Sequence, residues 1–257
     1  MPHVGWEVDG VRYSLEEALE IAQREKTFHG FPASVLKALT QEARNEIRLS
    51  PSSAQGCKRR RILEMLEPYY LDPEKLWAAA IGRAVHEWLQ NVPEEGVIRE
   101  VELTMPLDVY GVTIPLVGRI DYYDPERKLL LDYKTLSEFT SWNSKTGKRE
   151  LLELPASEHV LQVNLYSLLL RYNGYPVEEA AIWYVRVHKT ATRRIYPVEL
   201  WDEEEAYLWA VELAAPLAEA LKTGKLPPPY PEDHPEAWRC KFCPVSEACR
   251  IRAAKGE

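Results

Sequence analysis

The chain contains 257 residues, and its 40 acidic and 32 basic side chains give a formal net charge of -8 at pH 7. With 46% hydrophobic and 28% charged residues and 12 glycines, it can bury a substantial core and is neither collagen-like nor broadly disordered. The acidic balance argues against a protein that coats nucleic acid through bulk positive charge. No run approaches the roughly 18 apolar residues of a membrane span, and the first ten residues lack a signal-peptide pattern, so we expect a cytoplasmic protein with no membrane partner.

The first local signals predict a hairpin followed by a helix. Asp9 and Gly10 lie between short apolar runs, which favours a tight turn between two strands. Ser14 and Glu17 have the spacing of a capping box, which predicts a helix over Leu15–Lys26.

More helices are expected before the chain changes its pattern. One follows Pro32, and another covers Lys58–Leu66. A stronger helix begins at Asp72 and Pro73, because aspartate caps helices well and proline fits the first helical position. This helix carries His86.

Alternating apolar residues then predict strands in the middle of the chain. The runs Val97–Leu103, Val112–Ile120 and Lys128–Thr135 are separated by turn residues, and we expect them to form a three-stranded antiparallel meander. The polar stretch Leu136–Pro155 is longer than an ordinary connection, which favours a functional loop such as a lid.

The remaining elements are predicted from their end signals. A helix runs from Ser157 to a stop at Gly174. The runs Ala180–His188 and Arg193–Leu200 predict a hairpin, and Asp202 begins an amphipathic helix. A short tail with three cysteines follows.

The candidate chemistry lies on two neighbouring strands. Asp121 ends the run Gly118-Arg119-Ile120-Asp121, and Asp132 and Lys134 lie on the next strand with Tyr133 between them. Because side chains alternate along a strand, Asp132 and Lys134 point to one face and Tyr133 to the other. If Asp121 pairs near Asp132, the two carboxylates repel each other unless a cation lies between them. Oxygen ligands of this kind suit Mg²⁺ or Mn²⁺.

Such a site has a defined chemistry, although each motif is weak when taken alone. A bound metal ion would lower the pKa of a water molecule, and Lys134 would stabilise developing negative charge. An isolated D-x-K is ordinarily a surface ion pair. His86 on an apolar helix is ordinarily a core residue, and Gln162 and Tyr166, which share a helix face, are ordinarily an incidental pair.

The order of these motifs resembles a known family. A helix with G-x-x-x-H, a strand with G-x-x-D, a strand with D-x-K and a helix with Q-x-x-x-Y resemble the RecB-like branch of the PD-(D/E)XK nucleases. The resemblance implies a metal site made by the side chains of His86, Asp121 and Asp132 with the carbonyl of Tyr133. It implies a catalytic set that comprises Asp121, Asp132, Lys134, Gln162 and Tyr166, of which the last two would also contact DNA.

The four cysteines form a second candidate site. Cys57 precedes the nuclease motifs, and Cys240, Cys243 and Cys249 follow them. Disulfides fit poorly with a reducing cytosol, and the spacing alone leaves open both Zn²⁺ and an iron-sulfur cluster, since each takes four cysteine ligands. This arrangement resembles the iron-sulfur branch of the family, which includes the AddB nuclease domain and the CRISPR-associated Cas-four type enzymes. The resemblance implies a structural 4Fe-4S cluster, with Zn²⁺ as the alternative.

Further DNA contacts are expected from basic and aromatic residues. Arg59 and Arg60 belong to a basic run, and Lys145 belongs to another. Such runs are ordinarily solvated faces. Trp142 is a candidate for stacking on unpaired bases.

Together these patterns predict an α/β fold, and the resemblance implies a restriction-endonuclease-like core, with a mixed central sheet flanked by helices, and helical, cluster-bearing flanks. The expected segments are an N-terminal extension at 1–49, a first-cysteine helical segment at 50–71, the nuclease core at 72–200, and a C-terminal helix with the three-cysteine tail at 201–257. The function that the resemblance implies is a metal-dependent DNA exonuclease that acts on single strands or ends, in CRISPR adaptation or in DNA repair and recombination, with proteins of those pathways as partners. The alternative is a non-catalytic DNA-binding subunit that is stabilised by zinc or a cluster.

Overall fold

The computed structural model describes residues 3–40, 47–53, 56–92, 94–136, 138–143, 147–186 and 192–256. The chain divides into two compact units. Unit 1 comprises Met1–Ile47, Gly56–Ile81 and Pro216–Glu257, and unit 2 comprises Arg48–Gln55 and Gly82–Ala215. Within the described ranges, no helix combines the length and the apolar character that crossing a membrane demands.

Unit 1 combines a small sheet with short helices. Its sheet has the order β2-β1-β3, in which β1 pairs antiparallel with β2 and parallel with β3. Its elements are β1 (His3–Val8), β2 (Val11–Ser14), α1 (Leu15–Arg24), α2 (Ala33–Thr40), α3 (Lys58–Leu66), β3 (Tyr69–Leu71), the first part of α4 (Pro73–Gln90), the end of α6 (Glu203–Thr223), the 3-10 helix η2 (Ala237–Phe242) and α7 (Ser246–Ala254).

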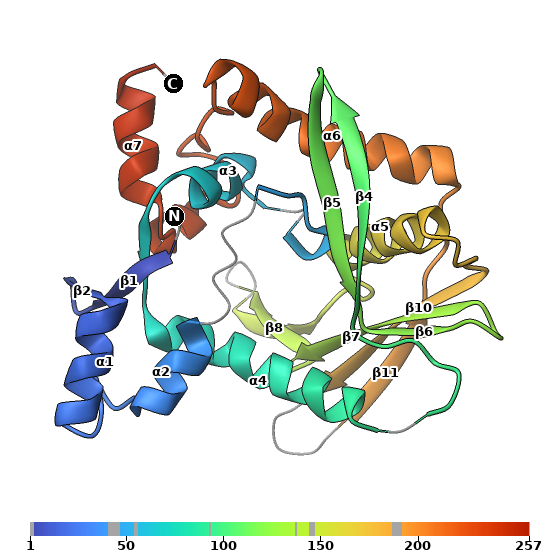
Figure 1. The fold of residues 1–257 in the computed structure, drawn as a ribbon, viewed down its shortest axis with the longest axis horizontal. Helices are drawn as coiled ribbons and strands as arrows, with labels where there is room; N and C mark the ends of the chain where they lie inside the picture. Colours follow the sequence, from blue (N-terminus) through green and yellow to red (C-terminus); the bar gives the residue numbers. More distant parts are fainter. Residues whose placement is uncertain are drawn as a thin grey trace. The chain divides into compact units, whose positions relative to one another are not determined.

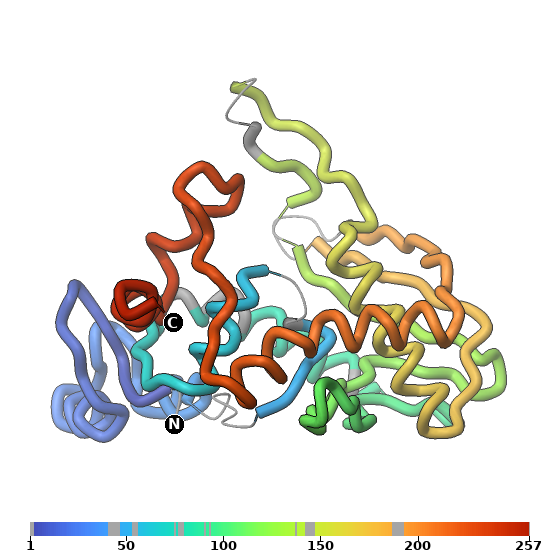
Figure 2. The backbone as a smooth tube through the Cα atoms, turned by 90° about the horizontal axis from the view of Figure 1, so that it is seen from above, coloured from blue at the N-terminus to red at the C-terminus, as the bar shows by residue number. Residues whose placement is uncertain are grey.

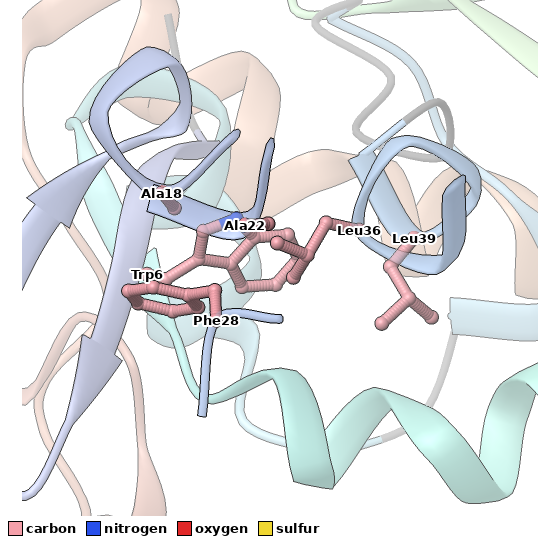
Figure 3. Packing of buried hydrophobic residues seen from close by; sticks show 6 residues of the cluster. All are labelled: Trp6, Ala18, Ala22, Phe28, Leu36 and Leu39. Carbon is pink, nitrogen blue, oxygen red and sulfur yellow. The ribbon is translucent and has the colours of Figure 1, made fainter. Parts of the chain in front are cut away.

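The predicted N-terminal hairpin and helix are confirmed. Ser14 accepts a hydrogen bond from the backbone of Glu17, and the Glu17 side chain accepts one from the backbone of Ser14, so the capping box is complete. The hydrophobic core of this region is built around Trp6 (Figure 3). The alanines of α1 in this core are small and leave room for the large ring. The labelled core residues are Trp6, Ala18, Ala22, Phe28, Leu36 and Leu39.

Unit 2 contains the main sheet, and its mixed α/β architecture confirms the predicted fold class. A four-stranded sheet has the order β11-β10-β7-β6, and β4 and β5 form a separate long ribbon (Figure 1). The elements are η1 (Pro51–Ser53), β4 (Val101–Val109), β5 (Val112–Ile120), β6 (Tyr122–Asp124), β7 (Leu129–Leu136), β8 (Thr140–Asn143), β9 (Lys148–Leu151), α5 (Ser157–Tyr172), β10 (Glu179–Arg186), β11 (Thr192–Pro197), the end of α4 and most of α6.

The predicted three-stranded meander is wrong. The strand β7 pairs antiparallel with the short β6 and parallel with β10, while β5 pairs with β4. Asp121 separates the end of β5 from the start of β6. The strand β7, which carries D-x-K, therefore lies in a different sheet from β5. The parallel pairing of β7 with β10 requires a crossover, and α5 provides it with ten consecutive buried residues.

Two helices cover opposite faces of β7. A Cβ atom added to Gly82 of α4 would lie 3.1 Å from the Thr135 side chain, whereas α5 covers the face that carries Asp132. The ribbon also approaches α5 closely, because a Cβ atom at Gly118 would lie 2.7 Å from both Tyr166 and Leu169. The glycine of the G-x-x-D motif therefore allows α5 to pack near the carboxylates.

The segment predicted as a polar loop contains a hairpin. The strands β8 and β9 pair antiparallel, with Trp142 opposite Arg149, and the hairpin extends away from the main sheet of its unit (Figure 2). The described part of this long connection thus includes paired strands, which were not predicted from the sequence. Its function as a lid stays a prediction.

Candidate active site

Three metal-ligating groups from distant segments of unit 2 meet at the start of the main sheet. They belong to His86 on α4, Glu100 immediately before β4, and Asp121 between β5 and β6, and one ligand atom of each lies within 4.8 Å of the others. The Nδ1 atom of His86 lies 3.2 Å from Oδ1 of Asp121 and 3.9 Å from Oε1 of Glu100. This arrangement can hold a divalent cation, because carboxylate oxygens suit Mg²⁺ or Mn²⁺ and imidazole is a common metal ligand.

Glu100 is a candidate ligand that the sequence patterns do not reveal. Its neighbours alternate as in an ordinary strand, so an acidic residue there resembles an outward-facing side chain. Its backbone has a φ of 51°, a left-handed conformation that is uncommon for residues other than glycine and costs roughly 1–2 kcal/mol. The conformation of Glu100 is a tertiary feature without a local sequence signal. Arg119 contacts its second oxygen at 3.2 Å.

The D-x-K strand lies beside these groups. The register of β6 and β7, extended by one residue, places Asp121 opposite Asp132. The backbone N–H of Tyr133 donates to Oδ2 of Asp121 at 2.9 Å, and Nζ of Lys134 lies 2.5 Å from Oδ2 of Asp132. As predicted, Asp132 and Lys134 share a face, while the ring of Tyr133 lies on the other face near His86.

A side chain of α5 contacts Asp132 and orients its carboxylate. The side-chain amide of Gln162 donates to Oδ1 of Asp132 at 3.4 Å and to the Tyr166 hydroxyl at 2.9 Å. Asp132 is only 1% exposed, and Gln162 and Tyr166 are also buried. These contacts give Gln162 and Tyr166 a role in orienting a carboxylate, and their predicted contact with DNA stays a prediction.

The electrostatics of the site favour a bound cation. Burial, opposed by the charge of Lys134, raises the pKa of Asp132 to about 6. Burial and the nearby charge of Asp121 raise the pKa of Glu100, and the contact with Asp121 raises the pKa of His86. Carboxylates with raised pKa values are unfavourable in their charged form, and a cation between them relieves that cost.

The four cysteines all belong to unit 1 and are free thiols. Burial raises the pKa of Cys57 and of Cys243, and charge on Cys249 and Cys240 raises the pKa of Cys57 further. Cys57 also caps α3 by accepting from the backbone of Arg60 at 3.4 Å. Among the residues that the structure describes, no three thiols lie within 4.8 Å of one another.

The predicted additional DNA contacts fall in different environments. Arg59 is 1% exposed and donates to the carbonyl oxygens of Pro227 and Cys249, so a contact with DNA would require these bonds to open. Arg60 lies on the surface and pairs with Glu64 at 2.6 Å. Lys145 lies outside the described residues, as does the side chain of Trp142, whose backbone belongs to β8. For Arg59, Arg60, Trp142 and Lys145, binding to DNA stays a prediction.

Comparisons with solved structures give distant matches. The crystal structure of SSO0001 matches with 20% identity and a TM-score of 0.52, over 84% of this chain and 93% of that one, which bears on the fold alone. A protein from Eubacterium rectale that is provisionally named an exonuclease matches with 17% identity and a TM-score of 0.41, over 96% of this chain and 76% of that one. A phage-related exonuclease from Haemophilus somnus 129PT matches with 14% identity and a TM-score of 0.29, over 82% and 93%. The last two TM-scores are too low to support an argument.

A search of curated proteins found no match. The family model of the PD-(D/E)XK nuclease superfamily matches residues 15–250, which include every residue of the site described above. The chain therefore belongs to the PD-(D/E)XK nuclease superfamily.

Proposed function

We propose that the protein hydrolyses phosphodiester bonds of DNA with Mg²⁺ or Mn²⁺ held by His86, Glu100, Asp121 and Asp132, together with the carbonyl of Tyr133. The observation that carries this proposal is the meeting of His86, Glu100 and Asp121 within 4.8 Å, next to a buried Asp132–Lys134 pair. When bound, the metal ion supplies an activated water molecule and neutralises charge on the phosphate.

The chain's own residues prepare the site for this reaction. The ammonium group of Lys134 lies against Asp132 at 2.5 Å, where it can donate a hydrogen bond to the attacking water or to a phosphate oxygen. The amide of Gln162 fixes one oxygen of Asp132, and the backbone of Tyr133 fixes one oxygen of Asp121. Both carboxylates are thereby held in place before a substrate binds, which lowers the cost of reorganisation.

The preferred substrate in this proposal is single-stranded DNA or a DNA end, which the enzyme degrades as an exonuclease. Support for this finer assignment comes from the RecB-like order of the motifs. The same resemblance supports a role in CRISPR adaptation or in DNA repair and recombination, with proteins of those pathways as partners.

The proposal includes a structural 4Fe-4S cluster on Cys57, Cys240, Cys243 and Cys249. Support for the cluster comes from the order of the cysteines, with one before and three after the nuclease motifs, which resembles the iron-sulfur branch of the family. Protein purified without oxygen should be brown and contain iron and sulfide, whereas colourless protein with one zinc ion would contradict the cluster.

The nuclease proposal is tested with end-labelled single- and double-stranded DNA. The wild-type protein should cut DNA with Mg²⁺ or Mn²⁺ and leave it intact with EDTA. The Asp121→Asn and Lys134→Ala variants should be inactive. Equal cutting by all three proteins would contradict this site, and binding of DNA by the wild type without cutting would favour a non-catalytic subunit.

A further inference from the structure

A histidine that belongs to none of the predicted motifs lies on the active-site face of α5. His159 is in the first turn of the helix, and residues 159, 162 and 166 recur at the spacing of one helix face. Gln162, one turn further along, contacts Asp132. His159 therefore extends the line of side chains that α5 directs toward the D-x-K strand.

The hydrogen bonds of His159 indicate which ring nitrogen carries the hydrogen. Nδ1 lies 2.7 Å from the hydroxyl of Tyr184, and this hydroxyl accepts a bond from the backbone N–H of Ala156 at 3.2 Å. Burial raises the pKa of Tyr184 to about 12, so the phenol keeps its hydrogen at neutral pH. Nδ1 is the acceptor available for that hydrogen among the described contacts, which leaves the ring hydrogen on Nε2.

His159 is also uncharged at neutral pH. Burial, helped by the positive charge of Lys134, lowers its pKa to about 4. The neutral ring with its hydrogen on Nε2 is a hydrogen-bond donor that adds no positive charge to the site. Within the described part of the chain, Nε2 has no hydrogen-bond partner, so its hydrogen is available to a bound substrate.

The sheet register places this donor beside the catalytic lysine. In the parallel pairing of β10 with β7, Tyr184 lies opposite Lys134, and Ile182 lies opposite Asp132. Paired residues on neighbouring strands project from the same face. The His159–Tyr184 pair and the ammonium group of Lys134 therefore share the face of β7 and β10 that α5 covers, next to Asp132.

We propose that Nε2–H of His159 donates a hydrogen bond to a non-bridging oxygen of the scissile DNA phosphate. His159 is then a substrate-binding residue that acts with Lys134, and it transfers no proton. Tyr184 acts as a positioning residue, because its hydroxyl selects the ring form that donates from Nε2. This inference rests on the proposed nuclease function and adds a group to the same site.

Two substitutions of His159 separate the roles of the two nitrogens. His159→Asn keeps a short polar group near Nδ1 and removes the distant donor, whereas His159→Gln places an amide N–H near the position of Nε2. On single-stranded DNA with Mg²⁺, we expect kcat/KM to fall on the order of 100-fold in His159→Asn and by less than about tenfold in His159→Gln. Thermal unfolding of the full-length variants shows whether each protein is folded in the assay.

A phosphorothioate substrate gives a readout that a purely structural role would not change. Sulfur replaces one of the two non-bridging oxygens at the scissile position and accepts hydrogen bonds poorly. The wild type should discriminate between the two isomers, and His159→Asn should lose at least part of that discrimination. Full activity and unchanged isomer preference in His159→Asn would overturn the inference.

A second variant keeps the test decisive if His159→Asn does not fold. Tyr184→Phe frees Nδ1 and lets the hydrogen occupy either nitrogen, so kcat/KM should fall roughly tenfold. An unchanged rate in that variant would overturn the inference. An inactive wild type would overturn the proposed function together with this inference, whereas an active wild type with unaffected variants would overturn this inference alone.

Discussion

Replacing Glu100 by glutamine tests the ligand that the sequence patterns missed. The change keeps the size of the side chain and removes one of the charges that meet within 4.8 Å. Without metal, we expect Glu100→Gln to be at least as stable as the wild type, because burial and Asp121 raise the pKa of Glu100 and so make its charge unfavourable. With metal, the variant should lose affinity by 10- to 100-fold or more, since loss of an outer-shell partner alone has an effect of about that size.

The expected shift in thermal stability follows from this affinity. At a free Mn²⁺ concentration of 100 times the wild-type Kd, binding stabilises the wild type by ~2.7 kcal/mol, and a hundredfold weaker site gives ~0.4 kcal/mol. For a chain of about this size, each kcal/mol corresponds to roughly 2–4 °C in Tm. The metal-induced rise in Tm should therefore fall from about 5–10 °C in the wild type to about 1–2 °C in Glu100→Gln.

Glu102→Gln provides the matched control. Glu102 lies two residues after Glu100, and its side chain is 48% exposed. It contacts Arg48 at 3.6 Å and does not belong to the group formed by His86, Glu100 and Asp121. Its substitution should leave the metal-induced rise in Tm unchanged. If Glu100→Gln keeps the full rise while Glu102→Gln behaves like the wild type, Glu100 is not a metal ligand.

Three further predictions concern packing, charge and pH. Lys134→Ala leaves the buried Asp132 carboxylate without its cation. Chemical denaturation at pH 7 should therefore show a free energy of unfolding about 3 kcal/mol below that of the wild type. This difference should shrink at pH 5 as Asp132 takes up a proton, and an equal difference at both pH values would contradict the prediction. Gly118→Ala places a Cβ atom 2.7 Å from the Tyr166 ring and should destabilise the protein by roughly 1–3 kcal/mol, whereas an unchanged Tm would mean that α5 shifts freely. Burial lowers the pKa of His159 in the folded protein to about 4. The neutral ring therefore contributes its full stability above pH 6.5, and this contribution is lost as the pH falls toward 4. Between pH 7 and pH 5, the Tm of His159→Gln should decline less than that of the wild type.

The sequence predicts well the elements that depend on local signals. The capping box at Ser14 begins α1, and Asp72 and Pro73 begin α4 as expected, with Asp72 accepting from the backbone of Glu74. The long helix α5 and the β10–β11 hairpin also follow their predicted ranges closely. In each case the residues that decide the structure are neighbours in the chain.

The errors concern pairing between distant segments. The strand β7 pairs in parallel with β10, which follows α5 in the sequence. No pattern within β7 distinguishes this pairing from pairing with the preceding strand. Glu100 was missed for a related reason, because its φ of 51° and its approach to His86 result from packing of α4 and the ribbon. The motif residues could be predicted because their order resembles that of a known family, whereas Glu100 belongs to none of those motifs.

Anomalous diffraction from crystals soaked in Mn²⁺ tests most directly whether these groups form one metal centre. We expect a strong peak in contact with Nδ1 or Nε2 of His86 and with carboxylate oxygens of Glu100 and Asp121, and no such peak in Asp121→Asn crystals. A saturating soak that places Mn²⁺ away from these three side chains, or that leaves them without any peak, would contradict a metal centre formed by these groups.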